Sequence, residues 1–270
     1  MTKESVYNNM FSKFFLPIFL FCIVMVFWQF AEDAINKIRV QSELTTLELF
    51  IPSPLSISHA FLRNWYQIAN ETSYTLSKAI VGFMIGATVA SIVATSYAMF
   101  PFLRTLTFPA VFAVNSFPVI GFAPVIVLLF GQGSFLSIAI ISCIVSYFPI
   151  LLTLDTAFRT VRDEYLELAH LYNATRLQAI MFIKLPLTAP SFFMALKLSF
   201  PASIVGATIG EWMGSPHGVG QLITIALYQL NPGLLYACLI EITLICVLAV
   251  SIINLIERLC LPWNFLKART

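Results

Sequence analysis

Six long apolar runs dominate this sequence and restrict what it can fold into. Each run is close to the roughly 20 residues that a helix needs to cross about 30 Å of hydrocarbon. The chain is 59% hydrophobic and 10% charged, against about 45–50% and 25% in soluble domains. This composition excludes an ordinary soluble enzyme, a disordered chain and a nucleic-acid-binding protein. We therefore predict an all-α membrane protein, one domain over 1–270, with six transmembrane helices at about 14–30, 78–100, 108–130, 135–154, 187–209 and 234–256.

The few basic residues predict the orientation, because cytoplasmic loops of membrane proteins are enriched in Lys and Arg. With both termini inside, ten basic residues lie on the cytoplasmic side and four on the outer side. The cytoplasmic set is Lys3, Lys13, Arg104, Arg159, Arg162, Arg176, Lys184, Arg258, Lys267 and Arg269. The outer set is Lys37, Arg39, Arg63 and Lys78. The N-in, C-in arrangement gives an outer loop at 31–77 and a cytoplasmic loop at 155–186.

The outer loop contains Ile51-Pro52-Ser53-Pro54, where the prolines interrupt any helix. The stretch that follows, 56–68, has apolar residues at helical spacing. It predicts either an interfacial helix or a packed loop.

The cytoplasmic loop carries the functional signal, because eight of the 28 charged residues lie in it. An apolar stripe at helical spacing nevertheless runs through Leu166, Ala169 and Tyr172. Asn173 tolerates the left-handed conformation that ends helices, and Pro186 is suited to the start of the next helix. We predict two short helices, the second at about 176–184, with a bend between them. An amphipathic helix of this kind suits docking into a groove on another protein.

The spacing of Glu167-Leu168-Ala169, Asn173 and Ile183-Lys184-Leu185-Pro186 resembles the EAA loop of bacterial ABC importer permeases. Leu168 stands where the family has Ala and Asn173 where it has Gly. Further short matches occur in the same order along most of the chain and resemble the nitrate, sulfonate and taurine permeases. These are Pro52-Ser53-Pro54, Gly82, Gly86, Pro118, Pro124, Gly131-Gln132-Gly133, Phe148-Pro149, Glu211, Gly214-Ser215, Gly218-Val219-Gly220 and Trp263.

The resemblance implies a homodimeric importer in which two ABC ATPase subunits bind ATP and Mg and a separate binding protein delivers substrate outside. The chain has no G-x-x-x-x-G-K-[ST] sequence and so no nucleotide loop of that type. The loop would contact the ATPase through Glu164, Glu167, Leu168, Ala169, His170, Tyr172, Asn173, Ile183, Leu185 and Pro186.

Several other residues are candidates for the transport pathway or its gate. Lys197 lies deep in the fifth apolar run, where a charge is costly. It could meet an anionic substrate, reach the interface, or pair with Glu241 of the sixth run, which is also a pathway or gating candidate. Glu211, at the outer end of the same run, suggests a structural or gating role. Asn115, Phe117 and Pro118 interrupt the third run, and interrupted helices in transporters often lie near the pathway. Gly82 and Gly86 form a G-x-x-x-G pattern that permits close helix contact.

The sequence gives less support to other classes of protein. Three isolated histidines and five cysteines mostly in apolar runs give no metal site or disulfide framework, and no catalytic constellation indicates an enzyme. One alternative is the transmembrane subunit of an energy-coupling-factor vitamin importer, against which the I-x-L-P spacing argues. Another is an ATP-independent secondary transporter or channel, which needs no docking segment. The substrate itself is not specified by the sequence.

Overall fold

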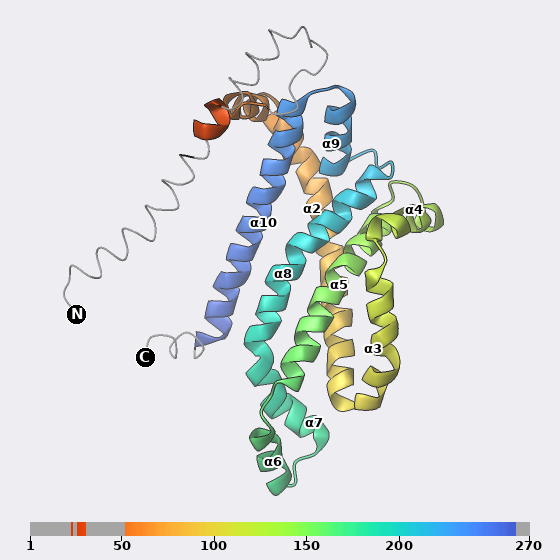
Figure 1. The fold of residues 1–270 in the computed structure, drawn as a ribbon, viewed down its shortest axis with the longest axis vertical. Helices are drawn as coiled ribbons and strands as arrows, with labels where there is room; N and C mark the ends of the chain where they lie inside the picture. The colour runs from red at the N-terminus through yellow and green to blue at the C-terminus, as the bar shows by residue number, and fades with distance from the viewer. Residues whose placement is uncertain (1–22, 24–25, 31–51, 263–270) are drawn as a thin grey trace, which may run out of the picture. The chain divides into compact units, whose positions relative to one another are not determined.

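The computed structural model describes residues 23, 26–30 and 52–262, and their regular structure is helical throughout (Figure 1). The helices are α2 (Pro54–Met99), α3 (Pro101–Ser116), α4 (Val119–Phe130), α5 (Phe135–Arg159), α6 (Asp163–Leu171), α7 (Arg176–Ala179), the π-helical turn Ile180–Lys184, α8 (Leu185–Trp212), α9 (Val219–Tyr228) and α10 (Pro232–Cys260).

Four helices within the described ranges are long and apolar enough to cross a membrane: α2, α5, α10 and the continuous helix from Arg176 to Trp212. A fifth candidate is the pair α3 and α4, which is bent by 94°. Most of the predicted first span, 14–30, lies outside the described residues. The all-helical class is therefore confirmed, whereas six spans and the N-in, C-in orientation stay predictions.

Helix α2 begins 24 residues before the predicted second span, so residues 54–77 are helical and not a loop. Of the two structures predicted for 56–68, a helix or a packed loop, the helix is present, and it is the first part of one continuous helix. Between residues 55 and 81 the chain has no Pro or Gly to interrupt the helix. Because this segment contains many polar side chains, it does not form an apolar run and was not predicted as part of a long helix. Some of them bond to their own helix, as when the Ser73 and Ser77 hydroxyls donate to backbone carbonyls at 2.7 and 2.8 Å.

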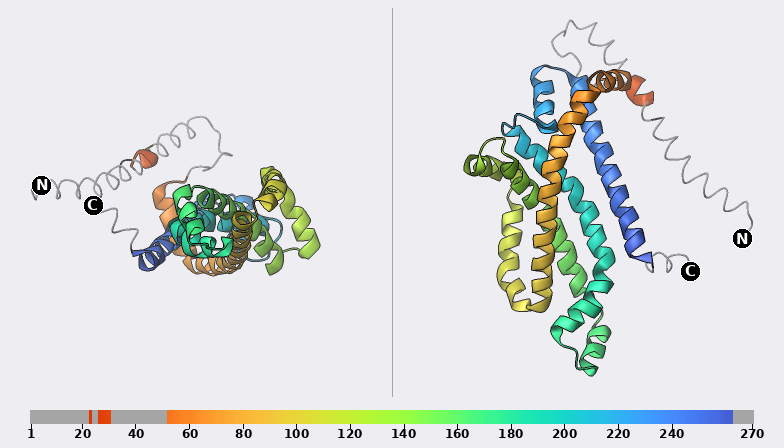
Figure 2. Two further views of the ribbon diagram at one scale, coloured as in Figure 1. Left: turned by 90° about the horizontal axis from the view of Figure 1, so that it is seen from below. Right: turned by 180° about the vertical axis from the view of Figure 1, so that it is seen from behind.

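The chain forms two compact units, and the larger comprises Tyr66–Thr224 and Ile240–Thr270. In this unit α5 packs against both α2 and α8, as the two views of Figure 2 show. The Ser142 hydroxyl on α5 lies 3.3 Å from the Ala79 carbonyl of α2 and 2.9 Å from the Ser203 carbonyl of α8.

Small residues allow α5 this close approach on both sides. A Cβ at Gly86 of α2 would lie 2.6 Å from the Ser146 hydroxyl, and one at Gly206 of α8 would lie 2.9 Å from the Ser142 Cα. Gly82 and Gly210 are similarly crowded by α5. The close helix contact predicted from Gly82 and Gly86 is thus present, and the helix that packs against these glycines is α5.

The smaller unit comprises Met1–Trp65 and Ile225–Leu239. Within it the first turns of α2 approach the start of α10, where a Cβ at Gly233 would lie 3.3 Å from Ala60. The Trp28 and Tyr236 rings also pack, with centroids 6.2 Å apart.

Candidate functional site

A helical hairpin formed by α6 and α7 lies beyond the ends of α5 and α8 (Figure 1). Asn173 has a φ of 51°, as expected for a left-handed residue closing α6. The Ala174 amide donates to the Ala169 carbonyl at 2.9 Å, which satisfies a carbonyl left free at the helix end. The second helix opens with a capping box, because the Thr175 and Gln178 side chains each accept from the other's backbone amide. The predicted first short helix and the bend at Asn173 are present. The predicted second short helix, 176–184, is not separate, because α7 continues through the π-helical turn into α8 and Arg176–Trp212 is one helix.

The hairpin presents apolar side chains on its outside. Leu171 and Tyr172 are each 80% exposed, and Phe182 is 77% exposed. A hollow of about 300 Å³ between the helices is lined by Leu168, Ala169, Tyr172, Ala174, Gln178, Ala179, Phe182 and Ile183. A cluster of exposed apolar groups next to a hollow is typical of a protein interaction site.

The structure brings the ten sequence-predicted ATPase-contact residues into this hairpin, the π-helical turn that follows it or the first turn of α8. Glu164 forms an exposed ion pair with Arg162 at 3.3 Å. Glu167, His170, Leu185 and Pro186 are also exposed, whereas Ala169 packs inside the hairpin. The loop is shorter than 155–186, because α5 continues to Arg159.

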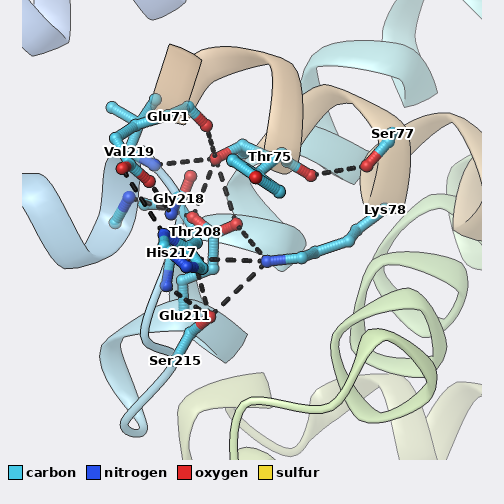
Figure 3. Close-up of polar contacts among 12 residues, drawn as sticks. Glu71, Thr75, Ser77, Lys78, Thr208, Glu211, Ser215, His217, Gly218 and Val219 are labelled. Carbon is cyan, nitrogen blue, oxygen red and sulfur yellow. Dashed lines mark hydrogen bonds and ion pairs between the residues drawn. The ribbon is translucent and has the colours of Figure 1, made fainter. Parts of the chain in front are cut away.

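At the other end of the same helices, a buried polar cluster surrounds Glu211, whose side chain is fully buried (Figure 3). The Lys78 ammonium lies 3.2 Å from one carboxylate oxygen of Glu211. The Thr75 hydroxyl donates to the same carboxylate at 2.9 to 3.0 Å, and the Gly220 amide donates at 3.0 Å. Lys78 also donates to the carbonyl of His217 at 3.2 Å. Burial of these charges is tolerated because each has several partners.

The same cluster holds the start of α9. The amides of Gly218 and Gly220 donate to Glu71 and Glu211, and the Val219 amide donates to the Thr75 hydroxyl at 2.8 Å. Carboxylates are favourable at this position because a helix N-terminus has unpaired amides and a partial positive charge. Gly218 has a φ of +122°, and a Cβ there would overlap the Glu211 carboxylate, so this position requires glycine.

On its exposed side the cluster ends at His217. Its imidazole stacks on Tyr74 with ring centroids 4.9 Å apart, and its Nδ1 lies 3.6 Å from Glu71. The sequence indicated Glu211 but not Glu71, Thr75 or Lys78, because all three fell in or beside the predicted outer loop. The available signal was a set of polar residues spaced by three or four positions on one face of a helix.

Lys197 is paired with Glu257 of α10, and not with Glu241. Of the alternatives left open for Lys197, pairing with Glu241 is the one that the structure contradicts. Glu257 lies one residue beyond the predicted end of the sixth span, so it was not considered as a partner. Glu241 is half-buried, and none of the ion pairs between described residues includes it.

The ion pair between Arg104 and Asp155 was not predicted. Arg104 near the start of α3 donates to both oxygens of Asp155 at 2.8 and 2.9 Å and lies 4.5 Å from the centroid of the Phe108 ring. Asp155 is buried in α5 and does not belong to the loop to which it was assigned.

The predicted interruption of the third span is present. Helix α3 ends at Ser116, the backbone of Phe117 and Pro118 is extended, and α4 starts at Val119. Asn115, Phe117 and Pro118 are exposed, and the Phe117 ring packs on Phe122 with centroids 5.5 Å apart. Among the described residues, no cluster of His, Cys, Asp or Glu is arranged to hold a metal ion.

Several apolar helices of membrane-spanning length, with a helical hairpin beyond the ends of two of them, define a multi-pass membrane protein. Comparison with known families matches residues 82–261 to the binding-protein-dependent transport system inner membrane component, and the chain belongs to this family. It is therefore a transport permease of the inner membrane, and the resemblance noted in the sequence is confirmed.

Relatives with named substrates match most of the chain. The riboflavin transport system permease protein of Chloroflexus aurantiacus is 28% identical over 255 residues, covering 92% of this chain and 90% of that protein. The formylaminopyrimidine transport permease protein of Halalkalibacterium halodurans is 24% identical over 253 residues, covering 92% and 95%. The nitrate import permease protein of Synechococcus elongatus is 20% identical over 149 residues, covering 55% and 53%.

Proposed function

We propose that this chain is the transmembrane subunit of an ATP-driven importer that receives a small solute from an extracytoplasmic binding protein. Two copies form the translocation pathway, and two ABC ATPase subunits bind ATP and Mg beneath them. The cargo is a small solute: a nitrate-, sulfonate- or taurine-like anion, or a pyrimidine or vitamin precursor.

The observation that carries this proposal is the capped α6–α7 hairpin with its exposed apolar face. Leu171, Tyr172 and Phe182 present a large apolar surface to a partner, while the cap and the Asn173 turn keep the hairpin ordered. The hairpin is joined to α5 on one side and is continuous with α8 on the other. A movement of the ATPase would therefore be passed directly to two of the packed helices. The ATPase can shift the equilibrium between the inward- and outward-facing states only if its contacts with the hairpin differ between the two states.

The ion pairs of Glu211 and Lys197 indicate which of the pathway candidates are free to contact substrate. Glu211 is occupied by Lys78, Thr75 and Gly220, so we assign it to holding α9 and not to binding substrate. Lys197 is balanced by Glu257, which removes the free positive charge that would favour an anionic cargo. The exposed residues Asn115, Phe117 and Pro118 at the interrupted third span remain the pathway candidates of this proposal.

Copurification with the ATPase tests the coupling role. Glu167→Arg reverses a charge on exposed α6, and we expect the tagged chain to lose most of the ATPase that the wild type retains on the affinity column. The control is Arg63→Glu, a charge reversal at an exposed position in the first part of α2, which should retain the ATPase. Equal recovery with Glu167→Arg and wild type, together with unchanged transport, would refute the assignment of the hairpin.

A further inference from the structure

A second hollow, on the other side of the hairpin, combines basic and apolar walls. Its volume is about 270 Å³. One wall is the turn between α2 and α3, including Met99 and Pro101, and the other includes Leu166 and Ile180. Arg176 and Lys184 also line it, and His170 adds a further nitrogen donor. It thus differs from the hollow around Tyr172, whose lining carries no charged side chain.

The positive charge in this hollow is not neutralised by the described part of the chain. None of the ion pairs between described residues includes Arg176 or Lys184. The acidic residues of α6, Asp163, Glu164 and Glu167, are absent from its lining. Arg104, in the neighbouring first turn of α3, is already bound by Asp155. Two cations beside an apolar wall therefore favour an anionic ligand that also has an apolar part.

The hollow lies where the apolar helices end. Met99 is the last residue of α2 and Pro101 the first of α3, and both helices belong to candidate spans. Lys184 directly precedes the apolar helix Leu185–Trp212. Residues at such boundaries lie at the height of the phospholipid headgroups, and basic pockets between membrane helices are known to hold anionic headgroups.

We propose that this hollow binds the phosphate-bearing headgroup of an anionic phospholipid. Arg176 and Lys184 hold the phosphate, and Met99, Pro101 and Ile180 contact the glycerol and the first acyl carbons. A bound lipid would join the α2–α3 turn to the hairpin. This inference rests on membrane residence and on the geometry of the hollow. The lining includes Ala169 and His170, which the proposed function assigns to the ATPase contact, so the test must distinguish lipid from ATPase.

Native mass spectrometry of the purified full-length chain, titrated with phosphatidylglycerol or phosphatidylcholine, tests the proposal. The test variant is Arg176→Gln/Lys184→Gln. The matched control is Arg159→Gln, an exposed base outside the lining. Each basic side chain near an anionic surface contributes about fivefold in affinity. We expect the double variant to bind phosphatidylglycerol roughly 20-fold or more weakly, and the control to bind like wild type.

Further experiments distinguish a lipid ligand from a free anion and from the ATPase. Arg176→Lys/Lys184→Arg keeps both charges and should retain binding, which distinguishes loss of charge from loss of folding. Inorganic phosphate at millimolar concentration should not displace the lipid; displacement would identify a free anion as the ligand. Equal phosphatidylglycerol binding by all variants would overturn the proposal. If the double variant instead lost only its ATPase, with lipid binding unchanged, the hollow would belong to that protein partner.

Discussion

Three ion pairs join distant segments of the chain, one between two buried side chains and two in which the base is partly buried. Lys78, Lys197 and Arg104 each meet a carboxylate of the same chain. The partners come from helices distant in sequence, so a single run of residues does not reveal them. Lys197 illustrates the consequence: its cost in an apolar helix was evident from the sequence, whereas Glu257, 60 positions later, was missed as its partner.

Neutralising Glu211 tests the importance of the cluster around α9. Glu211→Gln leaves the Lys78 ammonium, only 7% exposed, without its balancing charge. Loss of one partner of a buried ion pair typically destabilises a protein by about 3–5 kcal/mol. We expect a clear fall in the thermal unfolding midpoint of the purified full-length chain, measured in detergent.

Two comparisons make this result specific. Lys78→Met/Glu211→Gln removes both charges and should recover part of the loss. Glu164→Gln breaks a pair whose side chains are 72% and 70% exposed, and its effect should stay within about 1 kcal/mol. An unchanged midpoint for Glu211→Gln would show that the cluster contributes little to stability.

At the scale of helices, the predictions succeeded where local chemistry decides the structure. Asn173 and the apolar stripe of α6 specify the hairpin locally, and both were identified from the sequence. The interruption at Asn115–Pro118 was also local, because it follows from the proline. The length of α2 was missed because its polar first half has no apolar run, and the π-helical turn Ile180–Lys184 has no marker in the sequence.

Packing of α5 against α2 depends on a glycine, and this contact can be tested directly. A Cβ at Gly82 would lie 2.6 Å from the Ser142 Cβ, so Gly82→Ala must push the two helices apart. Overpacking of this kind costs about 1–3 kcal/mol. We expect a lower unfolding midpoint, measured by differential scanning fluorimetry of the purified chain.

The matched control for that substitution is Gly121→Ala in α4, where nothing lies within 4 Å of the added Cβ. Alanine is favoured over glycine within helices by about 0.5–1 kcal/mol. The control should therefore be neutral or slightly stabilising. A similar change in both variants would mean that α2 and α5 do not depend on this close approach.

For the whole molecule, the family and the helical class followed from the sequence because apolar length and motif order are linear features. The arrangement of α5 between α2 and α8 did not, because it depends on small residues such as Gly206 and Ser142 meeting across helices. The same limit applied to the Glu211 cluster, which joins α2, α8 and the start of α9. Contacts between distant segments need the three-dimensional structure.

Site-specific photocrosslinking provides the most direct test of the central claim, that the chain meets its ATPase through the α6–α7 hairpin. A benzophenone amino acid is placed at Tyr172 or, as a control, at Tyr66 of α2; both side chains are 80% exposed. After irradiation of the copurified complex, the account predicts an adduct with the ATPase from position 172 and none from position 66. An adduct from position 66 alone, or no ATPase adduct from position 172, would contradict it.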